Sequence, residues 1–205
     1  DISFLQHCKE LTNLNLRWCV GINDFSFLQH CIELTSLNLT ECRHINDFSF
    51  LQHFKELTSF NLSKCIQLND ISFLQHCKDL TSLDLSGCFL IKDFSLLQHC
   101  KKLTSLNLSG SGIQDISFLQ HCKKLTSLDL LGSRIKDTTS LQHCNKLTNL
   151  DLSDCKQIND FKFLQYLKNL RNLKCSDYHA QMILALYSIP KKVQESAKLN
   201  PFPDL

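Results

Sequence analysis

The sequence lacks the long apolar runs and the strong excess of one charge that mark several classes of protein. No stretch of about 18 apolar residues occurs, so no segment is predicted to span a membrane. The first residues show no basic region followed by an apolar run, so no signal peptide is predicted. Because the chain starts at Asp1 without Met, we expect a fragment or a processed form. A net charge of +2 disfavours a nucleic-acid partner, which usually meets a strongly basic face.

The signatures of catalysis and metal binding are also missing. The chain has only 5 glycines, and it contains no Gly-rich phosphate loop, no nucleophile elbow and no paired catalytic carboxylates. It has 12 cysteines but no CxxC pair of the kind that zinc sites use. We therefore expect no enzyme, no metal and no cofactor.

An internal repeat organises what is present. The period is 23 residues, except for two units of 22, and the units begin at Asp1, Asp24, Asp47, Asp70, Asp93, Asp115, Asp137 and Asp160. Each unit contains LTxLxLxxCxxI, in which alternate leucines point to one face of a short strand. Because one unit cannot bury that face alone, neighbouring units are predicted to stack with their strands parallel.

The segment before each strand predicts a short helix. From Asp70 to Cys77 there is room for about two turns of 3₁₀ or α-helix, with Asp70 or Ser72 as the N-cap. Phe73, Leu74 and Cys77 would then face the core.

The pattern LTxLxLxxCxxI, together with the preceding IxDxSxLxxC, resembles the leucine-rich repeat family. The short 22–23-residue units resemble internalin-like repeats, while the turn cysteine is similar to that of repeats in F-box proteins and parasite surface or effector proteins. The resemblance implies an α/β solenoid, a horseshoe with a parallel concave sheet and short 3₁₀ or α convex turns.

Two parts of the chain are expected. Residues 1–176 form the repeat solenoid of about eight units, and residues 177–205 form a C-terminal helical cap and tail. Asp177 would cap the first helix of the tail, and Pro190 would end it and start a second helix through residue 198. The core-facing side of the first helix would carry Tyr178, Met182, Ile183 and Leu186. No comparable N-terminal cap is seen, so the first strand is expected to expose an edge.

The cysteines and histidines follow the repeat. One cysteine column lies on the helix side and another in the turn after the strand, so we interpret the thiols as small buried core groups. Disulfides between adjacent repeats, zinc and a catalytic thiol stay as alternatives. The histidine column, His7 to His143, is interpreted as an outward-facing copy, with a pH-sensitive face or a metal-binding stripe as alternatives.

The solvent-facing positions of the strands and the residues just after them are the candidate partner-binding site, because the concave sheet usually carries recognition in this family. One set is an Asn/Asp column along the sheet, comprising Asn15, Asn38, Asn61, Asp84, Asn107, Asp129 and Asp151. The other set varies between repeats and comprises Arg17, Trp18, Glu41, Lys64 and Asp154. Trp18 is the best single contact candidate, since tryptophan and arginine dominate binding hot spots. Alternatives are a hydrogen-bonded ladder without a partner, random drift of exposed positions, and packing of Trp18 against upstream sequence.

We therefore predict a non-catalytic module that binds a protein partner. The resemblance implies uses such as adhesion, host-targeted effectors or substrate selection for ubiquitin ligases, and a structural spacer is a further alternative. Unpaired cysteines favour the cytoplasm or a host cytosol, whereas oxidised cysteines would favour an extracellular location.

Overall fold

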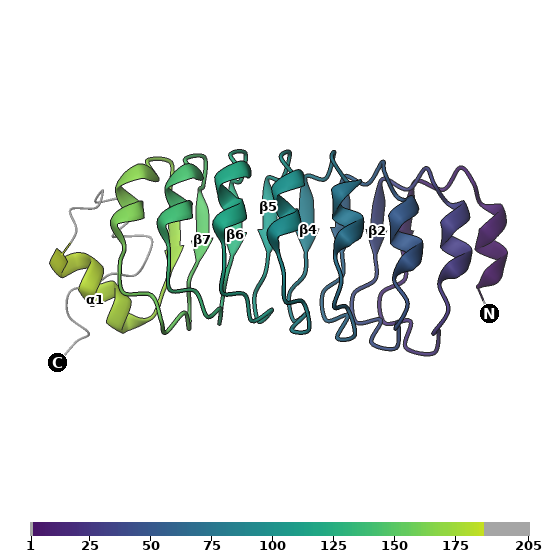
Figure 1. The fold of residues 1–205 in the computed structure, drawn as a ribbon, viewed down its shortest axis with the longest axis horizontal. Coiled ribbons are helices and arrows are strands. Elements are labelled where there is room, and N and C mark those ends of the chain that lie inside the picture. The colour runs from purple at the N-terminus through teal and green to yellow at the C-terminus, as the bar shows by residue number, and fades with distance from the viewer. Residues whose placement is uncertain (1, 187–205) are drawn as a thin grey trace.

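Eight parallel strands, one from each repeat, form a single open sheet in the sequential order β1 to β8. The structure, a computed structural model, describes residues 2–186. Every strand has three residues, and their bounds are β1 Asn13–Asn15, β2 Ser36–Asn38, β3 Ser59–Asn61, β4 Ser82–Asp84, β5 Ser105–Asn107, β6 Ser127–Asp129, β7 Asn149–Asp151 and β8 Asn172–Lys174. Figure 1 shows the strands side by side along the long axis, with a helix in front of each repeat.

The register of the sheet follows the repeat. Leu37 pairs with Phe60, and Phe60 pairs with Leu83, so each core residue stacks on its counterpart. Threonine adds a second ladder at the strand entrance, where the Thr58 hydroxyl donates to the Thr35 carbonyl at 3.1 Å and the Thr81 hydroxyl donates to Thr58 at 2.9 Å. The fixed period therefore gives a fixed register, as sequence analysis predicts.

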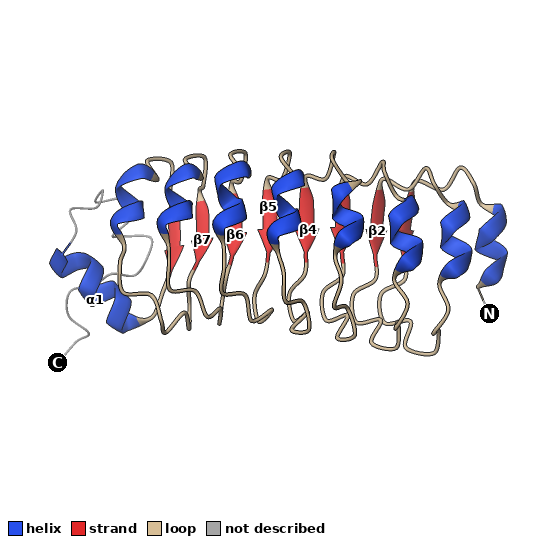
Figure 2. Ribbon diagram, viewed as in Figure 1, coloured by secondary structure: helices blue, strands red, loops and turns tan. Residues whose placement is uncertain are grey.

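Short 3₁₀ helices lie opposite the strands (Figure 2). Their bounds are η1 Ser3–His7, η2 Ser26–His30, η3 Ser49–His53, η4 Ser72–Gln75, η5 Ser95–His99, η6 Ser117–His121, η7 Thr139–His143 and η8 Lys162–Tyr166. The Asp that opens a repeat accepts the N–H two residues later, as Asp70 does from Ser72 at 2.8 Å. This bond is an Asx-type turn just before the helix. The N-cap itself is Ile71, without a side-chain cap, so the prediction of Asp70 or Ser72 as N-cap is wrong by one position.

The core fills the space between helices and sheet. Phe73, Leu74 and Cys77 are buried as predicted, and the exposed fraction of Leu74 is 0%. Each fully buried leucine or phenylalanine contributes about 1.5–3 kcal/mol relative to an exposed one. Because every repeat adds the same layer, the core runs the length of the solenoid.

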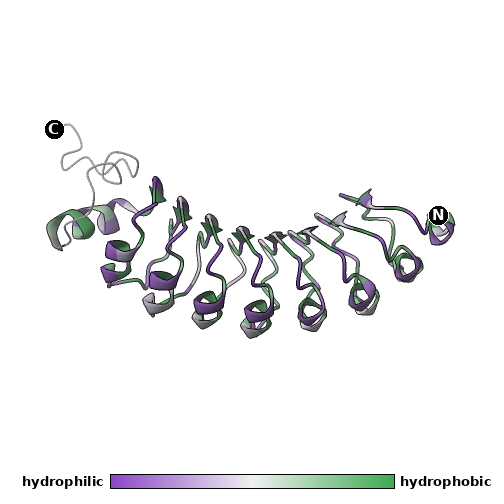
Figure 3. Ribbon diagram, turned by 90° about the horizontal axis from the view of Figure 1, so that it is seen from above, coloured by the Kyte–Doolittle hydropathy of each residue, from purple (hydrophilic) through white to green (hydrophobic). Residues whose placement is uncertain are grey.

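The solenoid is curved, with the strands on the inner side of the arc and the 3₁₀ helices on the outer side (Figure 3). The predicted horseshoe with a parallel concave sheet is therefore present. At one end β1 has a single strand neighbour, and Leu14 on it is only partly buried, as expected for an edge strand.

The helix α1, Asp177–Leu186, covers the other end after β8. Two details of its prediction are wrong. The Ser176 side chain accepts the His179 N–H at 3.4 Å and its carbonyl accepts that of Ala180, so Ser176 takes the capping position expected for Asp177. His179 and Ile183 form the buried face, while Tyr178 is 70% exposed and does not share that face with Ile183 as predicted. The second helix predicted after Pro190 lies outside the described residues.

Candidate functional site

The Asn/Asp column lies at the ends of the strands on the concave face and has a structural role in the first seven repeats, while the eighth has Lys174 at this position. The Oδ1 atom of each member accepts the backbone N–H two residues later, as Asn38 does from Thr40 at 2.9 Å and Asp151 does from Ser153 at 2.9 Å. The same bond is made by the other members, Asn15, Asn61, Asp84, Asn107 and Asp129. The column therefore turns the chain out of these strands. Some of its second polar atoms are also engaged, since Asn107 Nδ2 donates to Asp84 Oδ2 at 3.3 Å and Lys174 pairs with Asp151.

The residues after this column adopt a backbone conformation that side chains rarely take. Four of them have left-handed φ values, which are 61° at Trp18, 59° at Glu41, 57° at Lys64 and 56° at Asp154. The equivalent position in the intervening repeats is glycine, with φ values of 70° at Gly87, 62° at Gly110 and 69° at Gly132. A non-glycine residue in this region costs roughly 1–2 kcal/mol.

Side chains at this position form a rim along the C-terminal ends of the strands. We use the name exit rim for Trp18, Glu41, Lys64 and Asp154 with the adjacent Arg17 and Arg43. Strained residues that persist are a feature of functional sites, so the exit rim is the strongest candidate surface.

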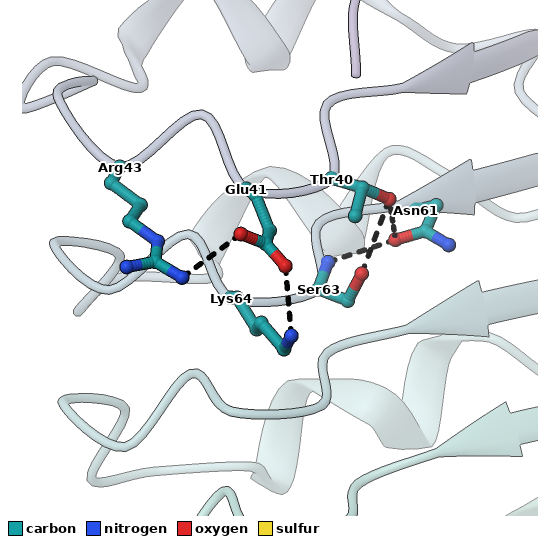
Figure 4. Close-up of polar contacts among 6 residues, drawn as sticks. All are labelled: Thr40, Glu41, Arg43, Asn61, Ser63 and Lys64. Atoms are coloured by element: carbon teal, nitrogen blue, oxygen red, sulfur yellow. Dashed lines mark hydrogen bonds and ion pairs between the residues drawn. The ribbon is translucent and has the colours of Figure 1, made fainter. Parts of the chain in front are cut away.

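Glu41 is the centre of a charged network on the exit rim (Figure 4). Its Oε1 accepts from Lys64 Nζ at 2.8 Å, and its Oε2 accepts from Arg43 at 2.9 Å. The hydrogen bond from Lys64 lowers the pKa of Glu41 below its ordinary value. Burial opposes this shift, and the Lys64 charge, the Arg43 hydrogen bond and the Arg43 charge add to it. The Glu41 carboxylate therefore bridges two basic side chains, one in its own turn and one in the next repeat.

A polar chain lies behind this network. The Thr40 hydroxyl donates to Asn61 Oδ1 at 2.9 Å, and the Ser63 hydroxyl donates to the Thr40 hydroxyl oxygen at 3.1 Å (Figure 4). Because Asn61 also holds its own turn, this chain links the two turns that carry Glu41 and Lys64.

Arg17 and Trp18 complete the rim at the first repeat. The Arg17 guanidinium lies 4.3 Å from the centroid of the Trp18 ring, a cation–π contact. Trp18 is 57% exposed, although its backbone N–H donates to Thr40 at 2.8 Å and so belongs to the sheet. The structure therefore places a large exposed aromatic ring on an ordered backbone.

Family models match this chain over its middle repeats. A model of two leucine-rich repeats matches residues 55–99 and 101–143, and a single leucine-rich repeat model matches residues 143–160. The chain belongs to the leucine-rich repeat family.

Solved structures of the family share its fold. Internalin C2 of Listeria monocytogenes superposes with a TM-score of 0.75 at 24% identity, over 84% of this chain and 74% of that one. The internalin InlJ of the same organism, whose functional domain includes a cysteine ladder, gives 0.64 at 20% identity over 83% and 36%. A leucine-rich repeat protein of Leptospira interrogans gives 0.66 at 16% identity over 94% and 58%. No curated protein sequence matches the chain.

The cysteine columns of this leucine-rich repeat chain are core groups that bind backbone. In the turn column the Cys65 thiol donates to the Leu39 carbonyl at 3.2 Å, and in the helix column the Cys31 thiol donates to Leu5 at 3.3 Å. Burial raises the pKa of Cys77 and of Cys88 to about 12. Such thiols stay protonated at neutral pH and do not supply a thiolate nucleophile.

The remaining predicted positions separate into two groups. Trp18, Glu41 and Lys64 lie on three consecutive repeats, whereas Asp154 lies beyond the three glycine turns. Near Asp154 the concave face is acidic, and burial followed by the Asp151 and Asp84 charges raises the pKa of Asp129. The sequence prediction missed Arg43, whose signal was its place two residues after Glu41 in the same turn.

Two features are absent from the described residues. Among residues 2–186, no group of three or more His, Cys, Asp or Glu side chains could hold a metal ion. The same residues contain no helix long and apolar enough to cross a bilayer. Repeat proteins of this family are generally binding modules rather than enzymes, because stacked repeats build an extended surface.

Proposed function

We propose that this protein is a non-catalytic protein-interaction module and that the exit rim makes the central contact with its partner. The observation that carries the proposal is the placement of Trp18, Glu41 and Lys64 in left-handed backbone where the next three repeats hold glycine. Glycine would be less strained at each position, so the side chains serve something other than the stability of the turn.

The chemistry of the rim fits a protein surface. It combines an exposed tryptophan and arginine with a preassembled ion network, and these are the residue types that concentrate binding energy. Because neighbouring side chains already hold one another, less conformational entropy is lost when a partner binds.

The concave face supplies the rest of the proposed interface. A shallow depression of about 290 Å³ is lined by small polar residues from Ser59 to Asp129, and another of about 260 Å³ extends toward Lys174. Short polar side chains at a sheet surface allow a partner to approach closely, so the rim would anchor it and the sheet would complement its shape.

Substitution by glycine tests the proposal without disturbing the fold. The variant Trp18→Gly/Glu41→Gly/Lys64→Gly converts three turns into copies of the Gly87, Gly110 and Gly132 turns. A matched control carries Gln29→Ala/Gln52→Ala/Gln75→Ala, which changes three exposed residues of the 3₁₀ helices.

We expect proteins captured from an extract of the source cells to be lost by the glycine variant and retained by the glutamine control. Equal capture by both variants would reject the exit rim. An absence of specific capture by the unaltered chain would favour a structural spacer.

We also propose a reducing compartment, the cytoplasm or a host cytosol. The buried thiols already use their donors on backbone carbonyls and need no oxidation to complete the core. An extracellular location is the alternative if the thiols are oxidised in the isolated protein.

A further inference from the structure

A second surface lies on the long edge where the chain passes from each helix into the next strand. This edge is the row of loops along the top of the view in Figure 1. In the last four repeats, six of the eight exposed residues between helix and strand are lysine, and the other two are Asn145 and Asn169. We call the six lysines the basic edge: Lys101, Lys102, Lys123, Lys124, Lys146 and Lys168.

The basic edge is specific to the second half of the solenoid. The position held by Lys102, Lys124 and Lys146 is acidic in the first four repeats, where it is Glu10, Glu33, Glu56 and Asp79. The corresponding loops of the last four repeats contain no carboxylate. The near-neutral net charge of the chain therefore conceals a local positive field.

One lysine of the basic edge already binds a carboxylate within the chain. Lys102 makes an ion pair with Asp79, its counterpart one repeat earlier. Within residues 2–186, the other five lysines of the basic edge make no ion pair. An ammonium group of this row thus pairs with a nearby carboxylate, and the five unpaired ammonium groups can pair with carboxylates of another protein.

We propose that the basic edge binds an acidic segment of a protein, extended along the solenoid axis. The lysines form a row along the solenoid axis, in which neighbouring strands are about 5 Å apart, so a segment with several Asp and Glu residues meets several ammonium groups at once. The row offers single ammonium charges without arginine forks, and Tyr166 is the aromatic residue that ends it. A nucleic-acid groove would add stacking platforms along the row, so the side chains favour a polypeptide.

This surface is independent of the exit rim, which lies at the opposite ends of the strands. One partner could contact both surfaces, but the interaction at the basic edge stands or fails by itself. Binding at the basic edge should also depend more strongly on salt than binding at the exit rim, because long-range charge attraction mainly raises the association rate and weakens with salt.

The experiment uses the full chain and a labelled oligoglutamate peptide. The variant Lys123→Glu/Lys124→Glu/Lys146→Glu reverses three charges of the basic edge. Its matched control, Lys92→Glu/Lys136→Glu/Lys156→Glu, reverses three exposed charges on the other edge and gives the same net charge. Circular dichroism establishes that both variants fold.

We expect the basic-edge variant to bind the peptide about tenfold or more weakly at low salt, since three exposed ion pairs become repulsive contacts. The control should bind about as tightly as the unaltered chain. Equal loss in both variants, or no peptide binding by the unaltered chain, would overturn the proposal.

Two further probes distinguish other polyanions. Binding of single-stranded DNA or of phosphatidylserine vesicles through the basic edge, without binding of the peptide, would also overturn it. So would self-association in light scattering that the basic-edge variant abolishes, because the occupant would then be a second copy with its acidic Glu10–Asp79 loops.

Discussion

The Lys64 ammonium lies 2.8 Å from Glu41 Oε1, and both residues hold the left-handed backbone that the following repeat gives to Gly87. The ion pair joins two consecutive repeats across the exit rim. A Cβ added to Gly87 would lie 3.1 Å from Lys64 Cγ, so the glycine next in the row also gives the lysine side chain its space. The position held by Lys64 and Gly87 therefore combines left-handed backbone, an ion pair between repeats and close side-chain packing.

The glycine turns should resist substitution according to their φ values. Gly110→Ala, at φ 62°, should lower the free energy of unfolding by about 1–2 kcal/mol, because alanine is strained in left-handed backbone. Gly21→Ala is the matched control, since a Cβ there meets nothing within 4 Å. It should change stability by about 0.5 kcal/mol or less. Urea denaturation measures the free energy of unfolding of both variants. Equal losses would contradict the left-handed backbone assigned to Gly110.

The two cysteine columns should respond differently to serine. The turn column already contains Ser111, whose hydroxyl donates to Leu108 at 2.7 Å, so Cys88→Ser should cost about 1 kcal/mol or less. In the helix column the Cys100 thiol is 3.8 Å from the Leu74 carbonyl, which a shorter hydroxyl does not reach. Cys100→Ser should therefore cost about 2 kcal/mol, as for a buried hydroxyl without a partner. Thermal unfolding of both variants tests this, and the reverse order would contradict the assignment of the columns.

The thiols should be protected by the fold rather than by oxidation. In the native protein without reductant, a thiol reagent should react slowly with the half-buried Cys8, Cys19 and Cys175 and spare the buried cysteines. After denaturation all 12 should react. Fewer than that, restored only by reductant, would indicate cross-linked columns and an extracellular protein.

The cap should weaken in mild acid through His179. The residue is 2% exposed, and its ring centroid lies 5.2 Å from that of Phe161 with the ring planes tilted by 58°. Its Nδ1 atom has no hydrogen-bond partner among residues 2–186. Burial lowers the pKa of His179 below 6.5 despite a hydrogen bond to Ile158. The unfolded state therefore takes up the proton first, so stability is complete above pH 6.5 and is lost as the pH falls below it.

Denaturation at several pH values tests this in the unaltered chain and in His179→Leu, which should lose the part of the pH dependence that begins below pH 6.5. Asp93, which precedes η5, does not interfere in this range. Hydrogen bonds from Ser95 lower the pKa of Asp93 from 3.8, so its contribution is lost only at more acidic pH. An unchanged pH profile in the variant would remove His179 from this account.

Much of the fold follows from periodicity. A repeat of fixed length with alternating leucines determines parallel strands and their register, and Leu37, Phe60 and Leu83 stack as that pattern predicts. The helix phase after Cys175 was predicted less well, because one short helix without a repeat gives no second copy to align. Tyr178 is therefore exposed, and His179, for which no position is predicted, is buried with Ile183.

The candidate site was predicted as a set of positions but not as a mechanism. The Asn/Asp column was interpreted as a contact surface, although its Oδ1 atoms are used by the turns. Backbone strain at Trp18 cannot be seen in one repeat. Its signal was the alignment of Trp18 with Gly87 and Gly110, which requires left-handed backbone to be considered at every copy of that position.

Site-specific photo-crosslinking tests the central claim, that the exit rim binds a protein, most directly. A photoreactive amino acid at position 18 or 64 should yield a discrete crosslinked protein in an extract of the source cells, because both positions lie on the rim. The same amino acid at Gln52 or Gln75, on the exposed side of η3 and η4, should yield none. Crosslinks from the helix positions alone, or an identical pattern from all four, would contradict the account.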